Sequence, residues 1–163
     1  MRSHMLKAAL ALAAFASGNT LMAKDSLGVF GGWAAFSDPD QRRCYAIAAP
    51  LKAGAREGQP YASIGTWPGR GVRNQVYFRL GRQTRKGTRI SLRVGSRWYR
   101  MAGGGVNAWA ADTTTNAAIL AAMRSSQSMT IAAFDTRGVR YTDRYPLAGA
   151  ATAIDAAIVG CAR

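Results

Sequence analysis

The segment NQVYFRL, residues 74–80, decides the fold class, because its side chains alternate strictly between apolar and polar. Val76, Phe78 and Leu80 fall on one side of an extended chain, and more polar residues occupy the positions between them. The segment TRISLRV, residues 88–94, repeats the alternation. Successive side chains of a strand point to opposite faces of a sheet, so both segments are predicted to be half-buried strands.

The segments around these two strands favour further antiparallel pairing. Gly95-Ser96 separates the second strand from residues 97–101, which is the signature of a two-residue hairpin. We expect another hairpin that turns through residues 135–138, and two earlier strands. The remaining predicted strands are 44–49, 62–67, 129–134 and 139–147, with loops at 50–60 and at the glycine run 103–105.

Two segments have helical spacing instead. Residues 116–124 follow a polar stretch suited to capping, and Arg124 suits the end of a helix. In residues 150–159, Ile154 and Ile158 are four apart, and Cys161 continues the face of Ile154. The chain is therefore predicted to be a mainly β, single-domain antiparallel β-sandwich or barrel-like fold with two short helices.

The first 23 residues are typical of a secretion signal. A basic start precedes an apolar core of about nine residues, too short for the roughly 20 that span a bilayer. Residues 21–23, Leu-Met-Ala, form the expected cleavage site, so the mature β-rich domain is predicted to be 24–163. No later segment has membrane-spanning length. The one histidine, His4, lies in the signal, so the mature chain lacks the usual general base.

The mature chain has two cysteines, Cys44 and Cys161. Outside the cytoplasm we expect them to form one disulfide, and two buried free thiols are the alternative. Two distant cysteines, no histidine and few carboxylates make a metal site improbable, and we expect no cofactor.

Charge is the strongest functional signal. The full chain has a formal charge of +14, and the 54 residues between Glu57 and Asp112 contain ten basic residues and no acidic one. By strand alternation Arg79, Arg89 and Arg93 share the outward side, where arginine forks suit phosphate, sulfate and carboxylate. The alternative is a merely solvated sheet face, with arginine favoured over lysine by codon usage.

Residues 66–73 place Trp67, Arg70 and Arg73 among turn residues. This segment is either an anion-binding loop or a tight connection in which Trp67 plugs the core. No motif supplies an activated nucleophile or a paired acid and base, because Asp38 and Asp40 flank Pro39 in a predicted turn. We therefore expect no catalytic residue and no enzyme activity.

Two short motifs resemble those of a known family. Phe30-Gly31-Gly32-Trp33 precedes the strand with Cys44, and the segment from Tyr145 to Ala157 contains a Leu-x-Gly-x-x-x-Ala-Ile pattern. Together they resemble the invasion-associated locus B family of exported proteobacterial proteins. The resemblance implies a periplasmic or envelope-associated β-sandwich-like domain, sometimes linked to host-cell invasion. It supplies no catalytic residues, and the motif positions are expected to be structural.

Two functions are compatible with these features. The first is a non-catalytic protein, periplasmic or secreted, that binds an anionic envelope glycan or lipopolysaccharide through its arginines. Nucleic acid is the less expected anion, because an exported protein rarely meets it. The second is a protein–protein interaction module that uses the exposed aromatics Tyr77, Tyr99 and Trp109.

Overall fold

A computed structural model describes residues 24–52 and 58–162, so the predicted signal at 1–23 lies outside the described residues. The described residues form ten strands and two α-helices. The strands are β1 Asp25–Phe30, β2 Trp33–Asp38, β3 Arg43–Ala48, β4 Tyr61–Trp67, β5 Val72–Arg79, β6 Ile90–Val94, β7 Arg97–Gly104, β8 Asn107–Ala110, β9 Ser128–Phe134 and β10 Arg140–Pro146. The helices are α1 Thr113–Ser125 and α2 Ala150–Cys161, and a short 3₁₀ turn covers Pro68–Arg70.

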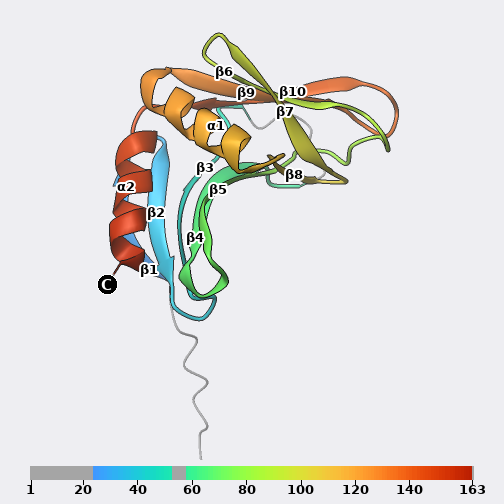
Figure 1. The fold of residues 1–163 in the computed structure, drawn as a ribbon. Coiled ribbons are helices and arrows are strands. Elements are labelled where there is room, and N and C mark those ends of the chain that lie inside the picture. Colours follow the sequence, from blue (N-terminus) through green and yellow to red (C-terminus); the bar gives the residue numbers. More distant parts are fainter. Residues whose placement is uncertain (1–23, 53–57, 163) are drawn as a thin grey trace, which may run out of the picture.

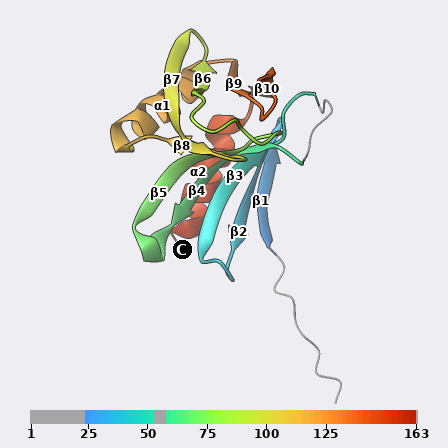
Figure 2. The same ribbon diagram turned by 90° about the vertical axis from the view of Figure 1, so that its right-hand side faces the viewer.

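All strands belong to one sheet with the order β1-β2-β3-β4-β5-β8-β7-β6-β9-β10. Every pairing is antiparallel, and the sheet curls into a half-barrel (Figure 1). Viewed from the side, α2 lies behind the row β1 to β5 (Figure 2). The mainly β, antiparallel and barrel-like prediction with two short helices is confirmed.

The core lies between the sheet and the two helices. Val76, Phe78 and Leu80 are buried, and so is the predicted inward set of β6. Helix α1 begins after Asp112, whose side chain accepts a hydrogen bond from the Thr115 amide at 2.7 Å, as the predicted cap requires. The alternation in the central strands therefore gives the correct inward face.

Three strands were not predicted, and one predicted loop is wrong. Strands β1, β2 and β8 lack the regular alternation of apolar and polar residues that identifies β6, because β2 and β8 each contain two alanines and Gly28 interrupts β1. Gly103 and Gly104 belong to β7, and only Gly105 and Val106 turn into β8. Gly103 has φ +142°, and a Cβ there would overlap the Asn107 backbone, so the glycine permits close pairing.

The two ends of the curled sheet meet at the turn between β1 and β2. Trp33 is fully buried, and its indole Nε1 donates to the carbonyl oxygen of Pro146, at the end of β10, at 2.8 Å. Gly149 precedes α2 with φ +86°, and a Cβ there would overlap the carbonyl oxygen of Phe30. The aromatic-glycine opening and the Leu-x-Gly segment thus have packing roles, as expected.

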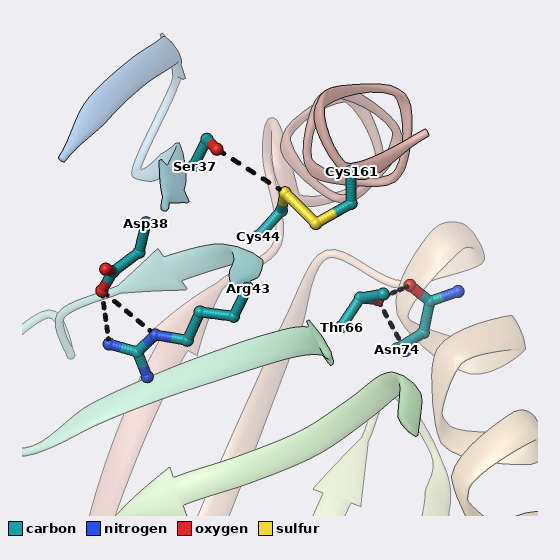
Figure 3. The surroundings of a disulfide bond; sticks show 7 residues. All are labelled: Ser37, Asp38, Arg43, Cys44, Thr66, Asn74 and Cys161. Atoms are coloured by element: carbon teal, nitrogen blue, oxygen red, sulfur yellow. Dashed lines mark hydrogen bonds and ion pairs between the residues drawn. A yellow bond between two sulfur atoms is a disulfide. The ribbon is translucent and has the colours of Figure 1, made fainter. Parts of the chain in front are cut away.

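Cys44 and Cys161 form a disulfide, which confirms the predicted pairing (Figure 3). It joins β3 to the last turn of α2 across 117 residues, with the two Cα atoms 5.7 Å apart. Beside it, Asp38 accepts hydrogen bonds from Arg43 and from the Gln41 amide, so Asp38 serves the turn as predicted. The disulfide therefore fixes α2 against β3, which precedes the basic segment 58–111.

We expect Cys44→Ser to lower the thermal stability of the protein. The disulfide closes a long loop, and in the chain-entropy model such a crosslink stabilises by up to about 4–5 kcal/mol. Differential scanning calorimetry measures the loss, and alkylation followed by mass spectrometry should modify Cys161 in the variant only. Two alkylated cysteines in the unreduced wild-type protein would contradict the pairing.

Candidate anion-binding site

The outer face of the sheet, opposite the two helices, carries the predicted arginines of the central strands. Arg93 is directly opposite Trp98 on β7, and its guanidinium lies 5.8 Å from the centre of that indole ring. Arg89 precedes β6 with the same parity as Arg93, and Arg79 ends β5 with the parity opposite to the buried Phe78. All three arginines are exposed, so they share one face as predicted.

The structure does not gather the five predicted arginines into one cluster. Arg79 and Arg93 are separated by three strand spacings, roughly 14 Å across the sheet even before their offset along the strands. Arg70 lies in the 3₁₀ turn and Arg73 at the start of β5, both at the β4–β5 end of the sheet. Arg89 and Arg93 therefore form one group, and Arg70 and Arg73 another.

Trp67, the aromatic residue of the 66–73 segment, does not plug the core. Its side chain is half-buried and lies over Gly65, where a Cβ would come within 2.7 Å of the indole ring. The Arg43 guanidinium lies 6.0 Å from the same ring. The expectation that Trp67 fills the core is therefore wrong. Gly65 has no side chain, so the indole ring of Trp67 packs against the surface of its own strand.

The predicted exposed aromatics are only partly exposed. Tyr99 faces the helices, and its hydroxyl donates to the carbonyl oxygen of Ala118 in α1 at 3.2 Å, so its assignment to the surface is wrong. Tyr77 is half-buried, and its hydroxyl donates to Asn107 at 2.6 Å. Burial, followed by the neighbouring Tyr61, raises the pKa of Tyr77 above its ordinary value. Trp109 is 39 % exposed and Trp98, which the sequence analysis did not select, is 62 % exposed.

A cavity of about 690 Å³ lies where the β5–β6 connection meets the end of β7 and the β7–β8 turn. Its walls include four cationic side chains and no carboxylate. The cations are Arg85, Lys86, Arg89 and Arg100. Only Arg89 belongs to the predicted site residues. Arg85 and Lys86 lie in a connection without alternation, and Arg100 lies on the neighbouring strand β7.

Backbone hydrogen bonds fix the wall formed by the β5–β6 connection. The Thr84 amide donates to the carbonyl oxygen of Gly105 at 2.7 Å, and the Arg85 amide donates to that of Phe134 at 2.9 Å. The Thr88 amide then donates to the Arg85 carbonyl at 3.1 Å, which closes a turn with Gly87 at φ +75°. The segment is thus attached both to the β7–β8 turn and to the end of β9.

Asp135 anchors this arrangement from the β9–β10 turn. Its carboxylate is buried, accepts from the Arg137 and Val139 amides, and also pairs with Arg82 at 3.1 Å. The Val139 amide, ahead of the Arg82 and Arg137 contributions, holds the pKa of Asp135 below its ordinary value. Its negative charge is therefore matched by these partners, and Asp135 does not belong to the lining of the cavity.

Other site chemistries find little support in the described residues. Across 24–52 and 58–162, no three His, Cys, Asp or Glu side chains are grouped to hold a metal ion. The same residues contain no helix long and apolar enough to cross a membrane. The cavity instead offers cationic side chains, hydroxyl groups and backbone amides as binding groups.

Comparisons with protein-family models, with curated proteins and with solved structures give no match. The resemblance to the invasion-associated locus B family therefore stays a prediction.

We expect Asp135→Asn to lower stability at neutral pH, because an amide cannot pair with Arg82 and offers fewer acceptors to the turn. The folded state holds this pKa below the unfolded value, so its stabilisation is present above the unfolded pKa, roughly pH 4, and is lost as pH falls through the folded pKa. Thermal unfolding of both proteins between pH 7 and pH 2.5 should show a difference that shrinks at the acid end. A difference that does not depend on pH would show that the charge of Asp135 is irrelevant.

Proposed function

We propose that this chain is an exported, non-catalytic envelope protein that binds anionic envelope components through the outer face of its sheet. The observation that supports the proposal most directly is a charge asymmetry. None of the aspartates in the described residues lies on the outer face of β5 to β10, whereas Arg79, Arg89 and Arg93 are exposed there. A face with one sign of charge attracts polyanions over a long range.

The acidic residues are occupied elsewhere, which leaves this charge uncompensated. Asp143 is buried and faces inward from β10, where it accepts from the Gly81 amide. Asp112 caps α1, and Asp155 on α2 pairs with Arg124 at 2.6 Å. These three carboxylates have structural partners within the fold, so they do not neutralise the arginines of the outer face.

The proposed location outside the cytoplasm rests on the signal-like residues 1–23 and on the disulfide. Disulfides persist in oxidising compartments such as the bacterial periplasm. Lipopolysaccharide carries phosphates and is available to a protein outside the inner membrane, so its phosphates are the proposed ligand. The resemblance to the invasion-associated locus B family favours the same location.

We expect the purified protein to bind lipopolysaccharide saturably, with an affinity that falls as salt is raised, because released counterions contribute much of the binding free energy. Replacing Arg79, Arg89 and Arg93 together by serine should weaken binding by about tenfold or more, since each exposed charge pair contributes up to about 1 kcal/mol. Surface plasmon resonance at low and at physiological salt measures both effects.

The matched control removes three cations that lie away from this face, by replacing Lys24, Lys52 and Arg97 with serine. Arg97 is paired with Val94 and so has the inward parity at the tip of its hairpin. The control should retain most of the affinity. Equal losses in the two triple variants would mean that net charge alone matters, and unchanged binding in both would refute the face.

A second candidate, a protein-interaction module, is favoured by the exposed indoles of Trp98 and Trp109. Exposed tryptophans are frequent anchors of protein interfaces. A partner cross-linked in the periplasm, retained at high salt and lost from Trp98→Ser and Trp109→Ser would support this module. Retention in both tryptophan variants would exclude these aromatics as its anchors.

A further inference from the structure

We infer that the cavity between the β5–β6 connection and the β7–β8 turn is a binding pocket for a phosphate group carried by a small sugar or lipid headgroup. This inference rests on the proposed function only in naming the phosphate of an envelope glycolipid as the ligand. The cavity volume of about 690 Å³ lies within the usual range of small-molecule sites, roughly 300–1,000 Å³.

The first argument is charge. Arg85, Lys86, Arg89 and Arg100 line the pocket, and none of these four side chains forms an ion pair with a carboxylate of the described residues. Arg100 is opposite Ser91 on the outer face, and the Arg85 guanidinium lies beside Gly138. Four like charges around one cavity repel one another, so a bound dianion would relieve the repulsion.

The second argument is the supply of directional donors. Arginine presents a planar fork that matches phosphate oxygens, and lysine adds a compact charge. Within the described residues, the Lys86 and Gly87 amides donate to no backbone or side-chain acceptor. Hydroxyl groups of Thr88 and Thr136 also belong to the lining. Such successive free amides in a turn are characteristic of anion-binding concavities.

The third argument is preorganisation. The β5–β6 connection is held at Thr84 and Arg85 by backbone hydrogen bonds to the β7–β8 turn and to β9, as described above. On the opposite wall, Gly104 has a backbone conformation open to any residue, and a Cβ built there meets no atom within 4 Å. The glycine thus leaves space that is not required by the packing of the protein itself.

That open space provides a steric test that leaves the charge unchanged. Gly104→Leu should fill the pocket without backbone strain. The double variant Lys86→Gln/Arg100→Gln removes two of its charges by an independent route. The matched control is Lys52→Gln/Arg97→Gln, which removes the same charge at two exposed positions outside the pocket lining. Thermal unfolding should first show that all three variants fold.

Isothermal titration of the purified proteins with inorganic pyrophosphate tests the pocket itself. Pyrophosphate should bind the wild-type protein and the control with affinities that agree to about twofold, and both pocket variants should bind at least about tenfold more weakly. Absent pyrophosphate binding, or equal binding by the control and the pocket variants, would overturn the inference whatever lipopolysaccharide does.

A second arm separates the two sources of phosphate. Lipopolysaccharide should bind the wild-type protein, and removal of its phosphates by a phosphatase should weaken binding to the level of the pocket variants. If the pocket variants lose pyrophosphate but keep lipopolysaccharide, the headgroup assignment is overturned and small phosphate compounds are the ligand. A further variant, Arg79→Gln/Arg93→Gln, tests the rest of the outer face. If it loses lipopolysaccharide binding while both pocket variants keep it, the pocket assignment fails and the proposed function stands.

Discussion

The closure of the curled sheet is the constraint on which the rest of the structure depends. Strands β1 to β5 and the remaining strands are joined through β5 and β8, whose register contains three residue pairs. This β5–β8 pairing, called the seam below, is too short to fix by itself the angle between the two halves of the sheet. The buried Trp33, its hydrogen bond to Pro146 and the contact of Gly149 with Phe30 join the opposite ends. Helix α2 then packs across β1 to β4, and the disulfide to Cys44 holds it there.

This closure also explains where the unpaired charge is found. With the helices and the core on one side, alternation sends Arg79 of β5, Arg93 of β6 and Arg100 of β7 to the other side. The carboxylates are taken up by caps, turns and the core, as at Asp112, Asp135 and Asp143. Near the seam, the β5–β6 connection folds onto the β7–β8 turn and brings Arg85 and Lys86 to the strand arginines. The pocket is therefore a product of long-range packing, although all of its cations lie within sixteen residues of the chain.

The sequence predicts the alternating strands and both helices, because the spacing of residues such as Val76 and Ile154 determines which face of each element is buried. It also predicts the disulfide, because the mature chain has only two cysteines. Strands β1, β2 and β8 could not be predicted, since the alanines of β2 and β8 and Gly28 in β1 weaken the alternation that marks a strand. The role of Gly103 and Gly104 required knowledge of the partner strand. Parity correctly placed Arg79, Arg89 and Arg93 on one face. It could not show that strand order separates Arg79 from Arg93, or that a loop brings Lys86 beside Arg100.

The central claim is that four cations without a carboxylate partner, Arg85, Lys86, Arg89 and Arg100, converge on one preformed phosphate pocket. Chemical-shift mapping of the ¹⁵N-labelled protein during titration with pyrophosphate tests this most directly. The account predicts saturable shifts for the amides of Lys86, Gly87, Gly104 and Gly105, with the amides around Arg70 and Arg73 unmoved. Shifts centred on Arg70 and Arg73, or small shifts spread over all exposed arginines without saturation, would contradict it.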